Sequence, residues 1–158
     1  MFEDGQSGSV VAYEGLGSSN RFQIKYTHSI HRTPVIETYI VKSGFIVQKS
    51  IAYKNFGVGM PENAGKGERF RKVKDMYVLD RMNREFPYID LRTGRVIADH
   101  VLIVKGEKKH FSTIVKPGTW VRIQYGKINL WNILKGGSSI ENKSGDDRAA
   151  AAGTVGEI

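Results

Sequence analysis

The chain has 158 residues, of which 40% are hydrophobic and 25% charged, and this composition is that of an ordinary globular protein of one domain. It contains no cysteine, which excludes disulfides, thiolate metal sites and cysteine nucleophiles. The net charge of +8, from 24 Lys and Arg against 16 Asp and Glu, favours contact with anionic surfaces, although solubility alone also accounts for it.

The two ends of the chain differ in composition from its middle. Residues 1–8 are polar and are predicted to form a flexible lead-in. Residues 137–158 are small and polar and bury too little surface to offset the entropy of ordering, so they are predicted to be a flexible low-complexity tail. The single β domain is then expected to span residues 9–136.

Strand patterns dominate the region between these ends. Residues 21–28 alternate polar and apolar side chains with period two, as in a strand with one buried face. Residues 34–41 are apolar on both faces and rich in β-branched side chains, which is typical of a central strand. Further strands are predicted at 45–53, 96–104, 111–115 and 120–125, and only residues 68–83 have a pattern that is compatible with a helix.

Turn sequences separate several of these predicted strands. Lys42-Ser43-Gly44 suits a hairpin between the second and third, and Lys116-Pro117-Gly118 suits a turn between the last two. Many short strands with regular turns predict an all-β fold, either an antiparallel sandwich or a small barrel, with few or no helices.

The densest unusual cluster is YTHSIHRTPVIE, residues 26–37. His28 continues the apolar face of its strand, and Glu37 lies on a strand that is apolar on both faces. A carboxylate in such a position needs a cation or several hydrogen-bond donors. If the two strands pair, His28, Arg32 and Glu37 could meet. The cluster is then either a ligand site, with His28 and Glu37 as candidate metal ligands, or a buried polar network that fixes strand register.

A second feature is NFGVGMPENAGKG, residues 55–67, which contains Gly57 and Gly59. It is not a dinucleotide loop, because Glu62 occupies the position of the third glycine, and it lacks the Ser or Thr of a Walker loop. This segment is interpreted either as a mobile binding loop or as a plain sharp turn. Ser29 beside His28 does not make a catalytic triad, because adjacent strand residues point to opposite faces. No catalytic constellation is present, so an enzyme is not expected, and no cofactor is expected.

Residues 65–74, GKGERFRKVK, form a basic run that could contact anionic lipid or nucleic acid. The sequence contains no recognisable RNA-binding motif, so a nucleic-acid partner is not favoured. A solvated loop is the simplest interpretation of this run.

Residues 22–41 and 55–63 together resemble the bacterial family catalogued as domain of unknown function 1850. The resemblance covers roughly residues 20–135. The residues that carry it are His28, Ser29, Pro34, Glu37, Phe56, Gly57, Gly59 and Met60, with a later turn such as Pro117-Gly118.

The resemblance implies a genomic neighbourhood and a cellular location. Members of that family are often encoded beside TAXI-type TRAP transporters, and they usually begin with a membrane-anchoring segment. This chain contains no apolar run near the ~20 residues that span a bilayer. The expectation is an extracytoplasmic domain tethered through a segment absent from this chain, or otherwise a cytoplasmic one.

Two functional hypotheses follow from the sequence. The first is an extracytoplasmic accessory module that contacts a transporter membrane subunit or its solute-binding protein, with an anionic membrane surface as a further possible contact. The second is a small-ligand or metal-ion binding module centred on His28, Arg32 and Glu37, with Ser29, Gly57, Gly59 and Met60 around it.

Overall fold

The computed structural model describes residues 1–57, 59–94, 99–126 and 138–139. These residues form short strands and two 3₁₀ helices, η1 (Gly17–Ser19) and η2 (Phe111–Thr113), and no helical segment among them is long and apolar enough to cross a membrane. The strands are β1 (Phe2–Asp4), β2 (Val10–Tyr13), β3 (Arg21–Thr27), β4 (Pro34–Lys42), β5 (Phe45–Tyr53), β6 (Arg69–Val73), β7 (Met76–Phe86), β8 (Tyr88–Arg92), β9 (Val101–Val104), β10 (Glu107–His110), β11 (Trp120–Gln124) and β12 (Ser138–Ser139).

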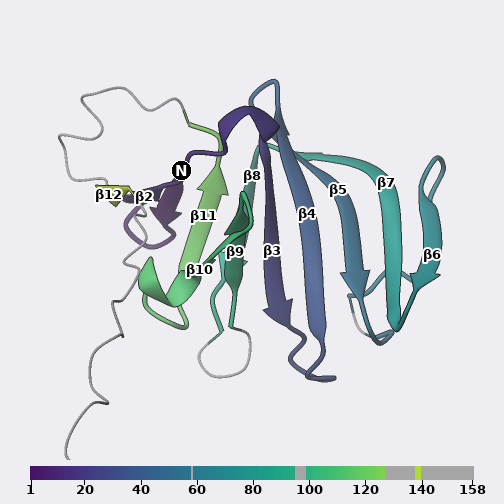
Figure 1. The fold of residues 1–158 in the computed structure, drawn as a ribbon. Helices are drawn as coiled ribbons and strands as arrows, with labels where there is room; N and C mark the ends of the chain where they lie inside the picture. The colour runs from purple at the N-terminus through teal and green to yellow at the C-terminus, as the bar shows by residue number, and fades with distance from the viewer. Residues whose placement is uncertain (58, 95–98, 127–137, 140–158) are drawn as a thin grey trace, which may run out of the picture.

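The strands build two sheets that pack as a sandwich (Figure 1). The smaller sheet has the order β12-β2-β1-β11-β8 and the larger has the order β10-β9-β3-β4-β5-β7-β6. Neighbouring strands are antiparallel except β12, which is parallel to β2. The predicted all-β antiparallel sandwich is therefore confirmed.

The hairpin turns follow from residues that tolerate positive φ. Ser43 and Gly44 have φ values of 52° and 84° and join β4 to β5, as the sequence predicted. Lys105 and Gly106, at 53° and 86°, join β9 to β10 in the same way. Two consecutive residues at positive φ match the right-handed twist of the flanking strands.

The main hydrophobic core lies between the two sheets. Side chains from the inner faces of both sheets interdigitate there, and burying them is the principal source of stability. Its buried members are Phe2, Ala12, Phe22, Ile24, Tyr39, Ile46, Leu102, Val104, Phe111, Val115, Val121 and Ile123.

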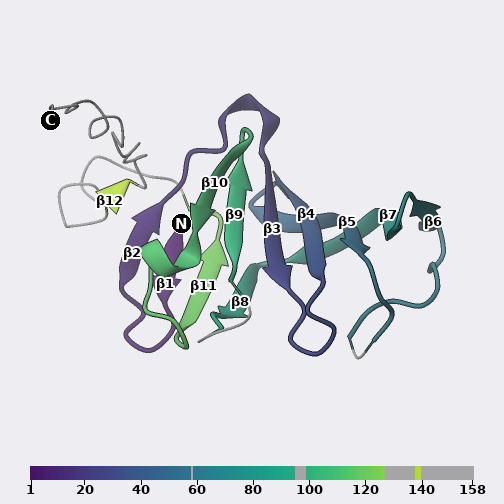
Figure 2. The same ribbon diagram turned by 60° about the horizontal axis from the view of Figure 1, so that its bottom comes forward.

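A second core covers the other half of the larger sheet. Figure 2 shows β5, β7 and β6 extending away from β1, β2 and β11. The loop between β5 and β6 contributes Met60, which packs against this half of the sheet. The buried members of this second core are Val35, Ile51, Tyr53, Leu79 and Met82.

The structure corrects the prediction of a flexible lead-in over residues 1–8. Phe2–Asp4 form β1, which pairs with β11 on one side and β2 on the other. The side chain of Phe2 is only 2% exposed in the main core. The burial of one apolar side chain anchors this three-residue strand. A single apolar residue in a polar segment does not make a recognisable strand pattern. Of the predicted tail 137–158, Ser138–Ser139 form β12, and the rest lies outside the described residues.

Two further local predictions differ from the structure. Residues 68–83, where a helix was compatible with the pattern, form the β6–β7 hairpin, in which Phe70 lies opposite Leu79. That apolar pair faces the second core, so tertiary packing decides the conformation of a segment with a mixed pattern. The predicted strand 111–115 begins instead with η2, and the described strand within 96–104 is β9.

Candidate functional site

Glu37 lies on the inner face of the larger sheet. The register places it opposite Ile24 of β3 and Ile51 of β5. Because side chains alternate along a strand, it shares this face with Val35 and Tyr39, which are 1% and 4% exposed. The carboxyl group therefore lies between the two hydrophobic cores.

Two tyrosine hydroxyls hold this carboxyl group. Tyr39 donates a hydrogen bond to Glu37 Oε2 at 2.8 Å, and Tyr26 donates a second one from β3. Tyr26 also stacks on His100, with the ring centroids 5.3 Å apart. A buried polar group needs such partners, and here they come from both paired strands. The trio of Glu37, Tyr26 and Tyr39 therefore links β3 to β4 through side chains.

Burial changes the proton affinity of all three groups. It raises the pKa of Glu37, and the hydrogen bonds from Tyr39 and Tyr26 oppose this change only in part. Burial, followed by the nearby Glu37 carboxylate, also raises the pKa of both Tyr26 and Tyr39. The tyrosines therefore remain donors, and the Glu37 carboxyl can keep its proton to a higher pH than an exposed glutamate.

His28 closes the turn between β3 and β4. Its Nδ1 accepts hydrogen bonds from the backbone N–H groups of Ile30 and His31, at 3.3 and 3.4 Å. The backbone N–H of Arg32 donates to the His28 carbonyl at 2.9 Å, and Arg32 has a φ of 52°. His28 is 8% exposed, and its side chain caps a tight turn because Nδ1 accepts two backbone N–H groups of that turn.

The two stretches that carry the family resemblance lie side by side. The imidazole of His31 rests so close to Gly57 that a Cβ there would lie 2.5 Å from His31 Nε2. The backbone N–H of Met60 donates to the Gly57 carbonyl at 2.9 Å, and Gly59 has a φ of 86°. Gly57 thus packs against the β3–β4 turn and is linked to Met60 by a backbone hydrogen bond.

The predicted meeting of His28, Arg32 and Glu37 is not what the strand register produces. Glu37 pairs with Ile24, four residues before His28, which corresponds to about 13 Å along an extended strand. The side chains that donate hydrogen bonds to Glu37 are Tyr26 and Tyr39. Among the described residues no three His, Asp or Glu side chains are placed to hold a metal ion. Ser29 and Arg32 are exposed in the turn.

An apolar cavity of about 280 Å³ opens between the sheets near Met1. Its walls include Phe22 and Ile123, and its rim includes Tyr125 and Gly126. Residues 127–137 follow that rim directly and lie outside the described residues, so the cavity supports no assignment.

The outer face of the smaller sheet carries an ordered set of exposed side chains, which we call the arginine–aromatic face: Tyr88, Asp90, Arg92, Trp120 and Arg122. Trp120 and Tyr88 are 45% and 41% exposed. The Arg122 guanidinium lies 3.8 Å from the Tyr88 ring centroid, and that of Arg92 lies 5.6 Å from the Trp120 ring. The rings of Tyr88 and Trp120 are thus exposed to solvent, each with a guanidinium group beside it.

A bidentate ion pair holds this face in place. Arg122 Nε and Nη2 donate to the two carboxylate oxygens of Asp90 at 2.7 and 2.8 Å, and these bonds lower the pKa of Asp90. Glu3 is opposite Arg122 on β1 and accepts a hydrogen bond from Gln124 at 2.6 Å. The residues that line a hollow of about 410 Å³ on this face include Glu3, Trp120 and Arg122. Contacts among the side chains of this face therefore hold Arg122 in one orientation.

Sequence reasoning missed Tyr26, Tyr39 and the arginine–aromatic face. The tyrosines could have been found, because they share the strand phase of His28 and Glu37. In residues 120–124 the alternation separates Trp120 and Arg122 from the buried Val121 and Ile123. No signal in the sequence showed that this strand would pair with residues 88–92.

Comparison with known proteins identifies a family. The model of a family described as a domain of unknown function (DUF1850) matches residues 22–111, which include both motif stretches and the trio around Glu37. No curated protein matches, and no solved structure matches.

Proposed function

The chain belongs to the family described as a domain of unknown function (DUF1850), and from this premise we propose that it is a noncatalytic docking module that serves a solute transporter through protein–protein contact. The observation that carries the proposal is the arginine–aromatic face. Tryptophan, tyrosine and arginine are the residues that most often dominate binding energy at protein interfaces.

The order of the face supports binding. Arg122 is fixed by Asp90 and stacked on Tyr88, so little side-chain entropy remains to be lost on association. With Glu3 of β1 beside it, the face presents two guanidinium groups and two carboxylates, which suits a partner surface with charges of both signs.

The proposed partner is a component of a TAXI-type TRAP transporter, either the membrane subunit or the solute-binding protein. The family resemblance motivates this choice, and it also motivates an extracytoplasmic, membrane-tethered location. In that arrangement the module holds or orients the partner and performs no chemistry of its own.

Gentle cross-linking and co-purification from the native membrane test the proposal. A tagged wild-type protein should recover a transporter subunit or its binding protein, identified by mass spectrometry. The Tyr88→Ser and Trp120→Ser double variant should lose that recovery. Phe45→Ser is the matched control, because Phe45 is 43% exposed but lies on β5, away from the arginine–aromatic face.

Two results would overturn the proposal. One is that the wild-type protein recovers no transporter component. The other is that the double variant recovers as much as the Phe45→Ser control. Circular dichroism and thermal unfolding of all three proteins establish that each is folded.

A second candidate function is small-ligand or metal-ion binding by the residues around Glu37. The buried carboxyl group with two phenolic donors favours the small-ligand form, because such a trio can bind a polar group in an apolar setting. Calorimetric titration with small organic acids and divalent ions checks it. Heat that disappears in Glu37→Gln supports this candidate, and absence of heat with the wild-type protein removes it.

A further inference from the structure

The outer face of the larger sheet contains a shallow hollow of about 430 Å³, which we call the basic hollow. Four cationic side chains and one carboxylate line it, so the local net charge is +3. These five residues come from four different strands: Arg21 from β3, Lys49 from β5, Arg69 from β6, and Asp80 and Arg81 from β7.

Strand register brings polar groups together on the floor of the hollow. Thr38, Ser50, Asp80 and Arg69 are paired in sequence across β4, β5, β7 and β6. Thr38 is 5% exposed, and its hydroxyl accepts a hydrogen bond from Gln23 at 3.0 Å. The hydroxyl hydrogens of Thr38 and Ser50 provide neutral donors beside the cations.

Two irregularities in the sheet occur at the basic hollow. The pairing of β5 with β7 shifts between Gln48 and Ser50, at Lys49. Arg81 has a φ of 59°, in the left-handed region that a long side chain seldom adopts. A β-bulge re-aims side chains, and here Lys49 and Arg81 both line the same hollow.

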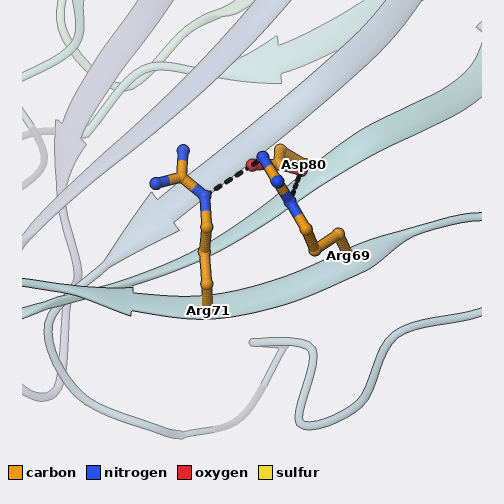
Figure 3. A network of polar contacts seen from close by, with 3 residues as sticks. All are labelled: Arg69, Arg71 and Asp80. Atoms are coloured by element: carbon orange, nitrogen blue, oxygen red, sulfur yellow. Dashed lines mark hydrogen bonds and ion pairs between the residues drawn. The ribbon is translucent and has the colours of Figure 1, made fainter.

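Asp80 organises the arginines at one edge of the basic hollow. Arg69 donates two hydrogen bonds to it at 3.0 Å each, and Arg71 donates one at 2.6 Å, as Figure 3 shows. Asp80 therefore neutralises part of the charge of two arginines. Among the described residues, Arg21, Lys49 and Arg81 form no ion pair, and Lys49 donates instead to Asn83 at 3.1 Å.

We propose that the basic hollow binds a phosphate group, carried by a phosphorylated small molecule or by a phospholipid headgroup. Four cationic side chains and two hydroxyl groups line the hollow. Together they offer more hydrogen-bond donors than the two oxygens of a carboxylate can match. A tetrahedral phosphate has more oxygens and a higher charge, and arginine matches it with paired donors. A volume of about 430 Å³ also leaves room for the group that the phosphate is attached to.

This inference does not depend on the proposed docking function. The basic hollow is on the outer face of the larger sheet, and the arginine–aromatic face is on the outer face of the smaller one. The two sites share no residue. Loss of one binding activity therefore leaves the other to be measured in the same protein.

The test uses three probes with the whole chain at low ionic strength. Inorganic phosphate and glycerol 3-phosphate are titrated calorimetrically, and vesicles of phosphatidylcholine with and without phosphatidylglycerol are tested by co-sedimentation. Binding of the soluble phosphates supports a phosphorylated small molecule. Binding confined to vesicles that contain phosphatidylglycerol supports a lipid headgroup.

Charge-matched variants separate a built site from general attraction. Lys49→Gln with Arg81→Gln should weaken binding by about tenfold or more. Lys108→Gln with Lys116→Gln removes the same charge from exposed positions outside the hollow and should weaken it by less than about twofold. Arg21→Gln provides a second variant should the first double variant unfold. Equal losses in the site and control variants, or no binding of any probe by the wild-type chain, would overturn the proposal.

Discussion

The guanidinium of Arg122 lies 3.8 Å from the centroid of the Tyr88 ring while the same group forms a bidentate ion pair with Asp90. All three side chains are on the solvent side of the smaller sheet. A cation that is stacked and paired in this way is held in one orientation. Such order on an exposed surface contributes little to the free energy of folding, and the docking proposal rests on it.

The Arg122–Asp90 pair should contribute little to stability. Its side chains are 39% and 41% exposed, and exposed ion pairs are generally worth ~0.2–1 kcal/mol. A double-mutant cycle with Arg122→Ala and Asp90→Ala, measured by urea unfolding, should give a coupling energy below about 1 kcal/mol that decreases with added salt. A coupling of several kcal/mol that salt does not change would mean that the pair is a structural element.

Glu37→Gln should change how stability depends on pH. Burial raises the pKa of Glu37 above its ordinary value of 4.5, so between these two values the folded chain binds more protons than the unfolded chain. The wild-type free energy of unfolding therefore falls, relative to the variant, as pH rises through that interval, and the difference is constant above it. Urea unfolding of both proteins from pH 4 to 8 checks this direction.

Glu85→Gln is the control for that series, because Glu85 is exposed on β7. Its unfolding free energy should track the wild type across the same pH interval. Glu37→Ala should cost more than Glu37→Gln, by about 1–3 kcal/mol, because it leaves the Tyr26 and Tyr39 hydroxyls without their acceptor. If Glu37→Gln shows the wild-type pH dependence, the account of this trio is wrong.

Gly5→Ala should destabilise the protein by about 1–3 kcal/mol, because a Cβ at this position would lie 2.6 Å from the Trp120 Cβ and 3.1 Å from the Trp120 carbonyl oxygen. These atoms belong to or adjoin the backbone and cannot rotate away. Gly15→Ala meets no atom within 4 Å and should be nearly neutral. Thermal unfolding of the two variants compares them, and equal midpoints would contradict the packing of the N-terminal segment on β11.

Asp80→Asn should remove a contribution to the free energy of unfolding that the wild-type protein loses in acid. Hydrogen bonds from Arg69 and Arg71 lower the pKa of Asp80 from 3.8 to about 2. The stabilisation is therefore complete above about pH 4 and is lost as pH falls through about 2. Because both arginines are about half exposed, we expect a loss of about 1 kcal/mol at pH 7. The difference between variant and wild type should disappear below about pH 2, and a difference that is independent of pH would contradict this account.

Much of the fold could be predicted because its signals are local. Alternation in residues 21–28 and the Ser43-Gly44 turn led directly to β3 and to the β4–β5 hairpin. The signals for β1 and for the β6–β7 hairpin are not local. Phe2 is buried only because β11 and β2 lie on either side of β1, and no pattern within three residues reveals such neighbours.

The candidate site was predictable only in part for the same reason. The sequence marked Glu37 as a carboxyl group that needs partners, and the structure supplies partners for it. It named His28 and Arg32 as the groups that could meet Glu37 if the two strands paired. The register of β3 with β4 determines which side chains reach Glu37. It brings Tyr26 within hydrogen-bonding distance of the Glu37 carboxyl group, whereas His28 caps the turn.

Photo-cross-linking from position 120 tests the central claim most directly. Benzoylphenylalanine in place of Trp120 puts a reactive aromatic group in the arginine–aromatic face, and the same residue in place of Lys108 is the control at an exposed position on β10. Irradiation in the native membrane should join position 120, and not position 108, to one transporter component. The absence of any such product from position 120, or equal products from both positions, would contradict a docking role for this face.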